Sequence, residues 1–195
     1  MSFEQIPLKQ GLMYHIPDFI GKSASFDFIQ QLKQEIKWKQ ETLRFFGKSL
    51  LTPRFTAWYG DEGMSYSYSG LKLSPNIWTP ALLEIKNMTE FATNCRFNSV
   101  LLNWYRNGND SMGWHSDDEK ELGLNPVIAS VSLGAERIFR VREKLNHKNS
   151  FGIKLNNGSL LLMAGELQHH WQHCLPRSAK SQGDRINLTF RMIVA

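Results

Sequence analysis

Residues 127–163 read VIASVSLGAERIFRVREKLNHKNSFGIKLNNGSLLLM, and this stretch decides the fold. Its polar turns separate four short apolar or alternating runs, at 127–133, 137–142, 151–155 and 158–163. Asn157-Gly158, between the last two runs, is a strong signal for a tight turn. Three further runs of the same kind lie outside the stretch, at 97–105, 170–175 and 184–194. Seven short strands without helices between them predict an antiparallel sandwich or jelly roll.

The N-terminal half predicts two helices. A helix over residues 25–38 would align four apolar side chains, Phe26, Ile29, Leu32 and Ile36. Thr79-Pro80 is a good helix start, a capping residue followed by a proline in the first turn. The helix that follows would carry one apolar stripe, formed by Leu82, Ile85, Met88 and Phe91. Residues 44–76 are rich in Gly, Ser and aromatics and indicate hairpins and loops. We expect both helices to pack outside one sheet, so the fold is mainly β with flanking helices.

The composition excludes several classes of protein. Hydrophobic residues make up 42% and charged residues 21% of the chain, which is ordinary globular usage and argues against disorder. The longest apolar runs are far too short to cross a bilayer, and residues 1–10 lack the apolar core of a secretory signal. Cys95 and Cys174 are too few for a disulfide scaffold or a four-cysteine zinc site. We therefore expect no membrane partner and a reduced compartment, cytoplasmic in a bacterium and nuclear in a eukaryote.

Several common catalytic motifs are missing. Gly-Lys-Ser begins at Gly21 and at Gly47, but Ile16 and Thr42 stand where a phosphate-binding loop needs its earlier glycine. The sequence contains no G-x-G-x-x-G after a strand, no H-E-x-x-H and no G-x-S-x-G. The net charge of +5 permits a polyanionic partner but identifies none.

The sharpest local feature is a histidine and an aspartate separated by one residue. On an extended chain His115 and Asp117 point to the same side. A third ligand from a distant strand would complete the two-histidine, one-carboxylate set that leaves positions open on Fe(II). The candidates for that ligand are His169, His170 and His173. The spacing is equally compatible with a surface turn whose acids are solvated.

The last predicted strand has two different faces. Its polar residues, Arg185, Asn187, Thr189 and Arg191, alternate with Ile186, Leu188 and Phe190. Two arginines on one face could bind both ends of a dicarboxylate through their planar forks, if that face lines a cavity. The alternative is a half-exposed strand with its arginines in water. Asn103 and Tyr105 also share one face of an otherwise apolar strand.

At this point the sequence resembles the AlkB family of Fe(II)- and 2-oxoglutarate-dependent nucleic-acid dealkylating dioxygenases, over residues 45–191. The matching stretches are LLNWYRNG, WHSDDE, IASVSLGA, GSLLLM, HWQHCLP and RINLTFR. Upstream, PRFTAWYG and YSYSGLKLSP resemble the branch that repairs duplex DNA. The resemblance implies one domain over residues 1–195, with a double-stranded β-helix (jelly roll) as its core. Residues 1–95 would supply the helices and a nucleotide-recognition lid of hairpins, and 96–195 the catalytic core.

The resemblance also assigns roles to residues. It implies three Fe(II) ligands, His115, Asp117 and His173, where the match to the WQH segment selects His173. Arg185 would bind the distal carboxylate of 2-oxoglutarate and Arg191 the end nearer the metal. The supporting hydrogen bonders would be Asn103, Tyr105 and Asn187. Dioxygen would take the remaining metal position.

For the nucleic acid, the resemblance implies five contact residues. Phe46 matches an intercalating finger, Arg54 a nearby DNA-contacting residue, and Glu119 the acid that faces the exocyclic nitrogen of the base. Tyr66 and Tyr68 match positions that line the base pocket. From the residues alone, Phe46 and the two tyrosines are equally compatible with core aromatics, and Glu119 with a solvated acid. The connection at 143–150 is shorter than in the family, which puts a backbone-gripping role there in doubt.

The implied activity is oxidative demethylation of N-alkylated DNA bases such as 1-methyladenine and 3-methylcytosine, with release of formaldehyde, succinate and CO2. The implied partner is alkylated DNA, double- and single-stranded. In a duplex, the alkylated base would have to be flipped out for the reaction. The protein is expected to act as a monomer. The alternatives are an RNA demethylase with the same chemistry, a nucleic-acid-binding module without catalysis, and a small-molecule hydroxylase of the same fold. The last would not need the aromatic segment at 45–68.

Overall fold

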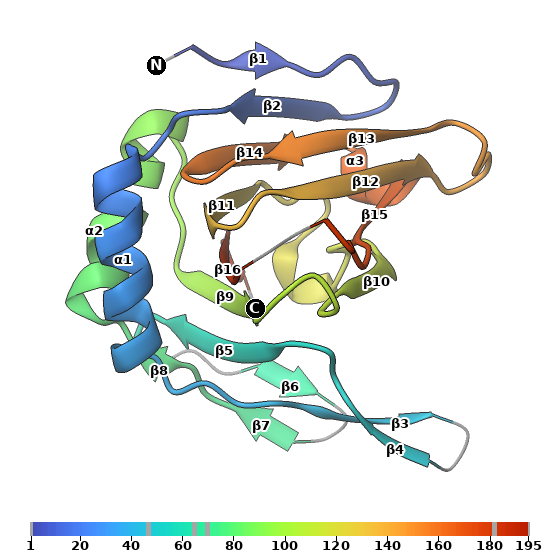
Figure 1. Cartoon of the computed structure of the whole chain (residues 1–195). Helices are drawn as coiled ribbons and strands as arrows, with labels where there is room; N and C mark the ends of the chain where they lie inside the picture. Colours follow the sequence, from blue (N-terminus) through green and yellow to red (C-terminus); the bar gives the residue numbers. More distant parts are fainter. Residues whose placement is uncertain (1, 46–47, 64–65, 69–70, 181–182, 195) are drawn as a thin grey trace.

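The computed structural model describes residues 2–45, 48–63, 66–68, 71–180 and 183–194, with side chains outside 43–48 and 64–73 (Figure 1). Its centre is an eight-stranded sheet. The strands, in spatial order, are β1 (Glu4–Gln5), β2 (Leu12–Ile16), β14 (Ser159–Ala164), β11 (Ile128–Gly134), β16 (Arg185–Arg191), β9 (Ser99–Tyr105), β5 (Phe55–Gly60) and β8 (Asn76–Ile77). All neighbours are antiparallel apart from β5 and β8, which pair in parallel.

A four-stranded sheet packs against one face of the large sheet. Its order is β10 (Met112–His115), β15 (Trp171–Leu175), β12 (Arg137–Glu143) and β13 (Ser150–Leu155). Buried apolar side chains from both sheets, such as Val141 and Leu161, form one continuous core between them. Two facing antiparallel sheets with this crossed connectivity make the double-stranded β-helix, so the predicted fold class is confirmed.

Two helices cover the other face of the large sheet (Figure 1). α1 (Lys22–Glu35) and α2 (Pro80–Thr93) pack on the apolar residues of the sheet in a second core, which includes Ile186, Leu188 and Phe190. Thr79 caps α2 as predicted, since its side chain accepts a hydrogen bond from the Leu82 backbone N–H at 3.4 Å. No helix among the residues described is long and apolar enough to cross a bilayer.

The apolar stripes of both helices differ in part from the prediction. Phe26 is 62% exposed, and Phe28 takes the buried place beside Ile29 and Leu32. The helix begins at Lys22 and ends at Glu35, where Ile36 turns into an extended conformation. Phe91 is 90% exposed, because the buried face of α2 runs through Thr89 and Glu90. Thr89 is tolerated there because its hydroxyl donates to the Ile85 carbonyl at 2.8 Å.

Two small hairpins are drawn below β5 in Figure 1. They are formed by β3 (Thr42–Phe45) with β4 (Lys48–Leu51), and by β6 (Tyr66–Tyr68) with β7 (Leu71–Leu73). The sequence predicted hairpins here. It did not predict β2, β5 and β10 as members of the main sheets, because their apolar residues are too few or too mixed to show a period. The predicted strand at 170–175 begins one residue later, after the short helix α3 (Leu167–His170). The second short helical turn is η1 (Lys120–Leu122).

Candidate metal centre and cosubstrate cavity

A cavity opens between the two sheets, and all eight residues predicted for metal and cosubstrate line it. From the large sheet come Asn103, Tyr105, Arg185, Asn187 and Arg191. The small sheet supplies His115 from β10 and His173 from β15, and the loop after β10 supplies Asp117. The polar face of β16 therefore points into the cavity, while its apolar face packs toward the helices. This resolves the open alternative of a solvated strand.

The three candidate metal ligands form a compact cluster. One ligand atom from each of His115, Asp117 and His173 lies within 4.8 Å of the others. Antiparallel pairing of β10 with β15 brings His115 opposite His173, with ring centroids 4.3 Å apart. His173 Nε2 lies 3.7 Å from Asp117 Oδ2. These separations suit three groups that share one cation.

The other two candidate histidines lie elsewhere. His169 Nε2 is 2.6 Å from the carbonyl of Leu124. His170 Nε2 is 3.7 Å from a carboxylate oxygen of Glu166, on the same short helix. Of the three histidines, only His173 is in the cluster; His169 and His170 belong to the short helix α3 and make other contacts.

Neighbouring groups orient the ligands. The Nδ1 of His115 lies 2.9 Å from the Gly113 carbonyl, which leaves Nε2 free to bind a metal. The backbone N–H of Asp117 donates to Gln168 Oε1 at 3.0 Å. Phe139 stacks on the ring of His173, at 5.1 Å between centroids and 26° between planes. Nothing in the sequence pattern marked Gln168 or Phe139, because each reaches the site only through the pairing of distant strands.

The protonation states of the cluster fit a divalent cation. Burial lowers the pKa of His173 to about 3, so its imidazole is neutral at pH 7 and offers a lone pair. Burial opposes ionisation of Asp117, but the positive charge of Arg191, with that of the histidines whenever they are protonated, outweighs it and holds its pKa below the usual value. Two imidazoles and one carboxylate, with space in front of them, are the donor set of non-haem Fe(II) oxygenases.

The far end of the cavity is built for an anion. Arg185 is 2% exposed and donates from Nη2 to Ser132 Oγ at 2.8 Å and to Asn187 Oδ1 at 2.6 Å. Its Nε, like that of Arg191, is buried without a hydrogen-bond partner in the described part of the chain. Burial lowers the pKa of Arg185 to about 10, which leaves it charged at pH 7. Buried donors without partners destabilise a protein unless a ligand satisfies them, and a dicarboxylate would do so.

The ring of Tyr105 is contacted by two guanidinium groups. Arg185 lies 5.4 Å and Arg137 5.8 Å from the centre of its ring. Burial raises the pKa of Tyr105 despite these charges, so the neutral phenol keeps its proton and can donate it to an acceptor. Arg137 is 3% exposed and was not singled out by the sequence.

Of the five residues predicted to contact nucleic acid, the side chains of two, Glu119 and Arg54, are described. Glu119 immediately precedes η1, and its Oε2 is buried without a hydrogen-bond partner among the described residues. Arg54 is half-buried and donates from Nε to Asn103 Oδ1 at 2.8 Å, toward the cavity wall. Phe46 lies outside the described residues. Tyr66 and Tyr68 form the ends of β6, and their side chains lie outside the described ones too.

A double-stranded β-helix that holds two histidines and one aspartate in a cavity with paired arginines defines the class of Fe(II)-dependent oxygenases. The sequence pattern of the 2OG-Fe(II) oxygenase superfamily matches residues 12–191. The chain belongs to this superfamily and, within it, to the AlkB family.

Two relatives illustrate this membership. Alpha-ketoglutarate-dependent dioxygenase alkB homolog 3 of Bos taurus is 41% identical over 186 residues, which cover 91% of this chain and 64% of that protein. DNA oxidative demethylase ALKBH2 of Homo sapiens is 39% identical over 199 residues, which cover 95% of this chain and 75% of that protein. This chain thus spans 64% of the length of the bovine relative. The solved structure described as "The structure of OsALKBH1" has the same fold, with a TM-score of 0.69 and 16% identity over 97% of this chain and 100% of that one.

Proposed function

We propose that the protein removes alkyl groups from N-alkylated DNA bases of the 1-methyladenine and 3-methylcytosine type, using Fe(II), 2-oxoglutarate and O2. The products would be the repaired base, formaldehyde, succinate and CO2. One observation carries the proposal: the His115, Asp117 and His173 cluster shares a buried cavity with two arginines whose Nε atoms have no partner among the described residues. A dicarboxylate could bind the metal with one end and Arg185 with the other, so it would fit both the ligand cluster and the buried arginine donors.

The chain's own residues have distinct tasks in this proposal. His115, Asp117 and His173 hold the metal, and Arg185 and Arg191 orient the cosubstrate. When bound, Fe(II) with 2-oxoglutarate supplies the activation of O2 that oxidises the alkyl carbon. The apolar lining, which includes Leu101, Met163 and Leu175, keeps water from that reaction. No protein nucleophile is needed, which agrees with the absence of the usual hydrolase motifs from the sequence.

The choice of nucleic acid rests on relatives and on one acidic group. The ALKBH2 relatives are named DNA oxidative demethylases, and this supports DNA as the substrate here. N-alkylated adenine and cytosine carry positive charge, and Glu119 Oε2, which is buried without a partner among the described residues, would favour such a base. The base must leave the duplex to reach a metal between two sheets. We place Phe46, Tyr66 and Tyr68 on the substrate side for this step, as the resemblance implies.

The test loads the protein with Fe(II) and 2-oxoglutarate without oxygen, then adds O2 and a methylated oligonucleotide. We expect loss of one methyl mass from DNA and an equal amount of formaldehyde, in single- and double-stranded form. Asp117→Ala is the matched inactive control. RNA of the same sequence forms a further arm. A rate on RNA well above that on both DNA forms would replace the proposal by RNA demethylation, and no product from any strand would refute it.

A further inference from the structure

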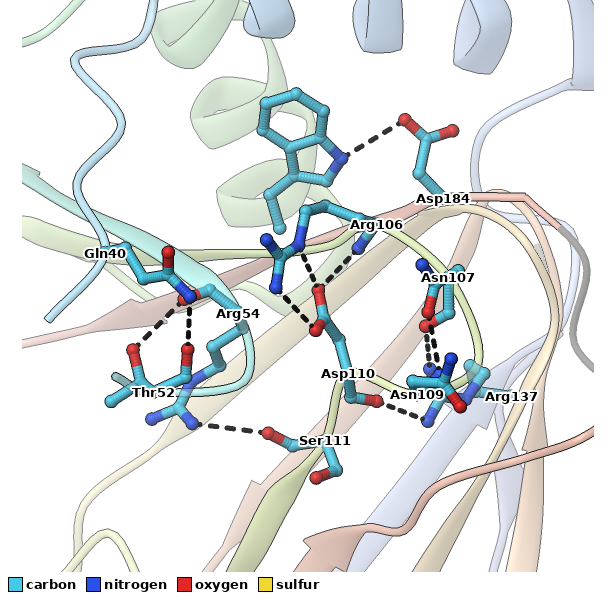
Figure 2. A network of polar contacts seen from close by, with 11 residues as sticks. Gln40, Thr52, Arg54, Arg106, Asn107, Asn109, Asp110, Ser111, Arg137 and Asp184 are labelled. Atoms are coloured by element: carbon cyan, nitrogen blue, oxygen red, sulfur yellow. Dashed lines mark hydrogen bonds and ion pairs between the residues drawn. The ribbon is translucent and has the colours of Figure 1, made fainter. Parts of the chain in front are cut away.

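Arg54 lies where three parts of the chain meet, close to Gln40, Thr52 and Ser111 (Figure 2). It stands just before β5. Its Nε donates to Asn103 Oδ1 at 2.8 Å, and its Nη1 donates to the Ser111 carbonyl at 3.3 Å. Asn103 is 6% exposed and lines the cavity, and Ser111 directly precedes β10, the strand that ends in His115. The guanidinium is therefore held on the outer side of the cavity wall.

The segment around Arg54 is anchored on both sides. The Thr52 carbonyl accepts from the Arg54 N–H at 2.8 Å and from Gln40 Nε2 at 2.8 Å, a contact that Figure 2 shows. On the other side, the Ser111 N–H donates to the Pro53 carbonyl at 3.0 Å. A long arginine side chain usually samples many rotamers, but this backbone anchoring limits where the guanidinium can reach.

The contact with Asn103 has only one possible polarity. A guanidinium donates hydrogen bonds and accepts none, so the amide atom that faces Arg54 must be the oxygen. The amino group of Asn103 is then the part of the amide that is left for the cavity. An amino group attracts a carboxylate, whereas an amide oxygen turned the same way would repel it. Arg54 thereby decides which end of Asn103 a bound anion meets.

We infer that Arg54 is a positioning residue of the cosubstrate pocket, which acts through Asn103. This rests on the proposed function, because the anion is taken to be 2-oxoglutarate. Two of the five N–H groups of Arg54 are used by protein acceptors, and these two bonds hold the guanidinium against Asn103 and the residue before β10.

The test measures 2-oxoglutarate binding without turnover. Protein loaded with Mn(II) is titrated with 2-oxoglutarate in a calorimeter, for wild type, Arg54→Ala, Asn103→Ala and the double variant. We expect Arg54→Ala to raise the Kd by about tenfold, the effect of losing one hydrogen bond to a charged group. Because Arg54 acts through Asn103, the double variant should stay within about twofold of Asn103→Ala. Losses that multiply in the double variant would overturn the inference.

Controls separate positioning from folding and from DNA binding. Arg140→Ala removes the same charge at an exposed position outside the cavity and should keep the wild-type Kd. Arg54→Gln keeps a donor but can also accept, so it no longer fixes the direction of the Asn103 amide and should also weaken binding. It carries the test if Arg54→Ala does not fold, as judged by thermal melting. A normal Kd in Arg54→Gln would refute the inference.

A DNA titration of the same variants at several salt concentrations covers the competing role. If positioning of Asn103 is the whole role of Arg54, Arg54→Ala should bind a methylated oligonucleotide with wild-type affinity and salt dependence. A wild-type Kd for 2-oxoglutarate combined with weaker, less salt-dependent DNA binding would establish Arg54 as a DNA contact instead. If wild-type protein bound no 2-oxoglutarate, the proposed function itself would fail, which is a different result from normal binding by the variants.

Discussion

Arg191 donates a hydrogen bond from Nη2 to Asp117 Oδ1, and this ion pair joins the end of β16 to the metal cluster. The same guanidinium lines the cavity. Arg185, at the other end of the strand, donates instead to Ser132 and Asn187. The two arginines of one strand face therefore have different neighbours. One touches a metal ligand, and the other touches hydroxyl and amide groups.

This difference predicts different effects of replacing the two arginines. Arg185→Ala should raise the Kd for 2-oxoglutarate by roughly 30-fold to several thousand-fold, which is the cost of truncating one partner of a buried charge pair. It should leave Mn(II) affinity close to that of wild type. Arg185→Lys should also bind poorly, because an ammonium cannot form the fork. Calorimetric titrations with Mn(II) and then with 2-oxoglutarate measure both quantities.

Arg191→Ala should weaken both metal and cosubstrate binding. Asp117 loses the donor that holds its carboxylate, and loss of such an outer contact reduces metal affinity by about tenfold or more. Removal of a nearby positive charge acts in the opposite direction, so we expect the lower end of that range. Unchanged Mn(II) affinity in Arg191→Ala would show that the ion pair does not position Asp117. Normal 2-oxoglutarate binding by both arginine variants would eliminate the dicarboxylate interpretation.

Replacing a metal ligand should abolish activity. His115→Ala, Asp117→Ala and His173→Ala each remove one of three protein ligands, so Fe(II) binding and formaldehyde release should both be lost. His169→Ala and His170→Ala are matched controls, because these side chains contact Leu124 and Glu166 outside the cluster. They should keep most of the turnover. Formaldehyde release that survives in His173→Ala but not in His170→Ala would mean that the third ligand is misassigned.

The role of Phe46 in duplex repair stays a prediction, since this residue lies outside the described ones. If it is a finger that fills the gap left by a flipped base, Phe46→Ala should slow repair of double-stranded DNA strongly and of single-stranded DNA weakly. The melting temperature should hardly change. If Phe46 is a core residue, the truncation should cost roughly 3–5 kcal/mol of stability and reduce both activities together.

Gly158 is a position where only glycine fits. Its φ is +76°, and a Cβ there would lie 2.0 Å from the Ile20 carbonyl oxygen. Its backbone N–H donates to Ser132 and its carbonyl accepts from Ile20, so the chain cannot move aside freely. Gly158→Ala should reduce the free energy of unfolding by on the order of 3 kcal/mol. Gly21→Ala, where a Cβ meets nothing within 4 Å, should change it by less than about 0.5 kcal/mol. Equal urea midpoints for the two variants would contradict this account.

His15 should make stability depend on pH. It lies 7% exposed in β2, and burial lowers its pKa below the ordinary 6.5, against the opposing charge of Glu4. Below about pH 6.5 the unfolded chain therefore binds a proton at His15 that the folded protein resists binding. The contribution of neutral His15 to the free energy of unfolding is full above that pH and is lost as the pH falls. Urea unfolding at pH 7.5 and 5.5 should show a smaller decline for His15→Leu than for wild type. Glu4→Gln should steepen the decline, and equal slopes in all three proteins would rule out this role.

The period of a strand let the sequence determine much of the site. Alternation along β16 assigned Arg185, Asn187 and Arg191 to one face and Leu188 and Phe190 to the other, and the cavity and the helix-facing core occupy those two faces. The turn at Gly158 and the cap at Thr79 were likewise readable, because each depends on a few consecutive residues. Local physics therefore reached an antiparallel sandwich or jelly roll and showed which polar residues share a strand face, but it left open whether that face lines a cavity.

What depended on long-range pairing was decided only by the tertiary structure. Spacing left three histidines open as the third ligand, and the pairing of β10 with β15 places His173 opposite His115. Phe139 could not be associated with His173 until β12 paired with β15. Arg54 is a further example. Its match to the family suggests a DNA contact, whereas in the folded chain its guanidinium donates to Asn103. A long polar side chain binds whichever acceptors the folded chain brings within its reach, and neighbouring residues in sequence do not determine those acceptors.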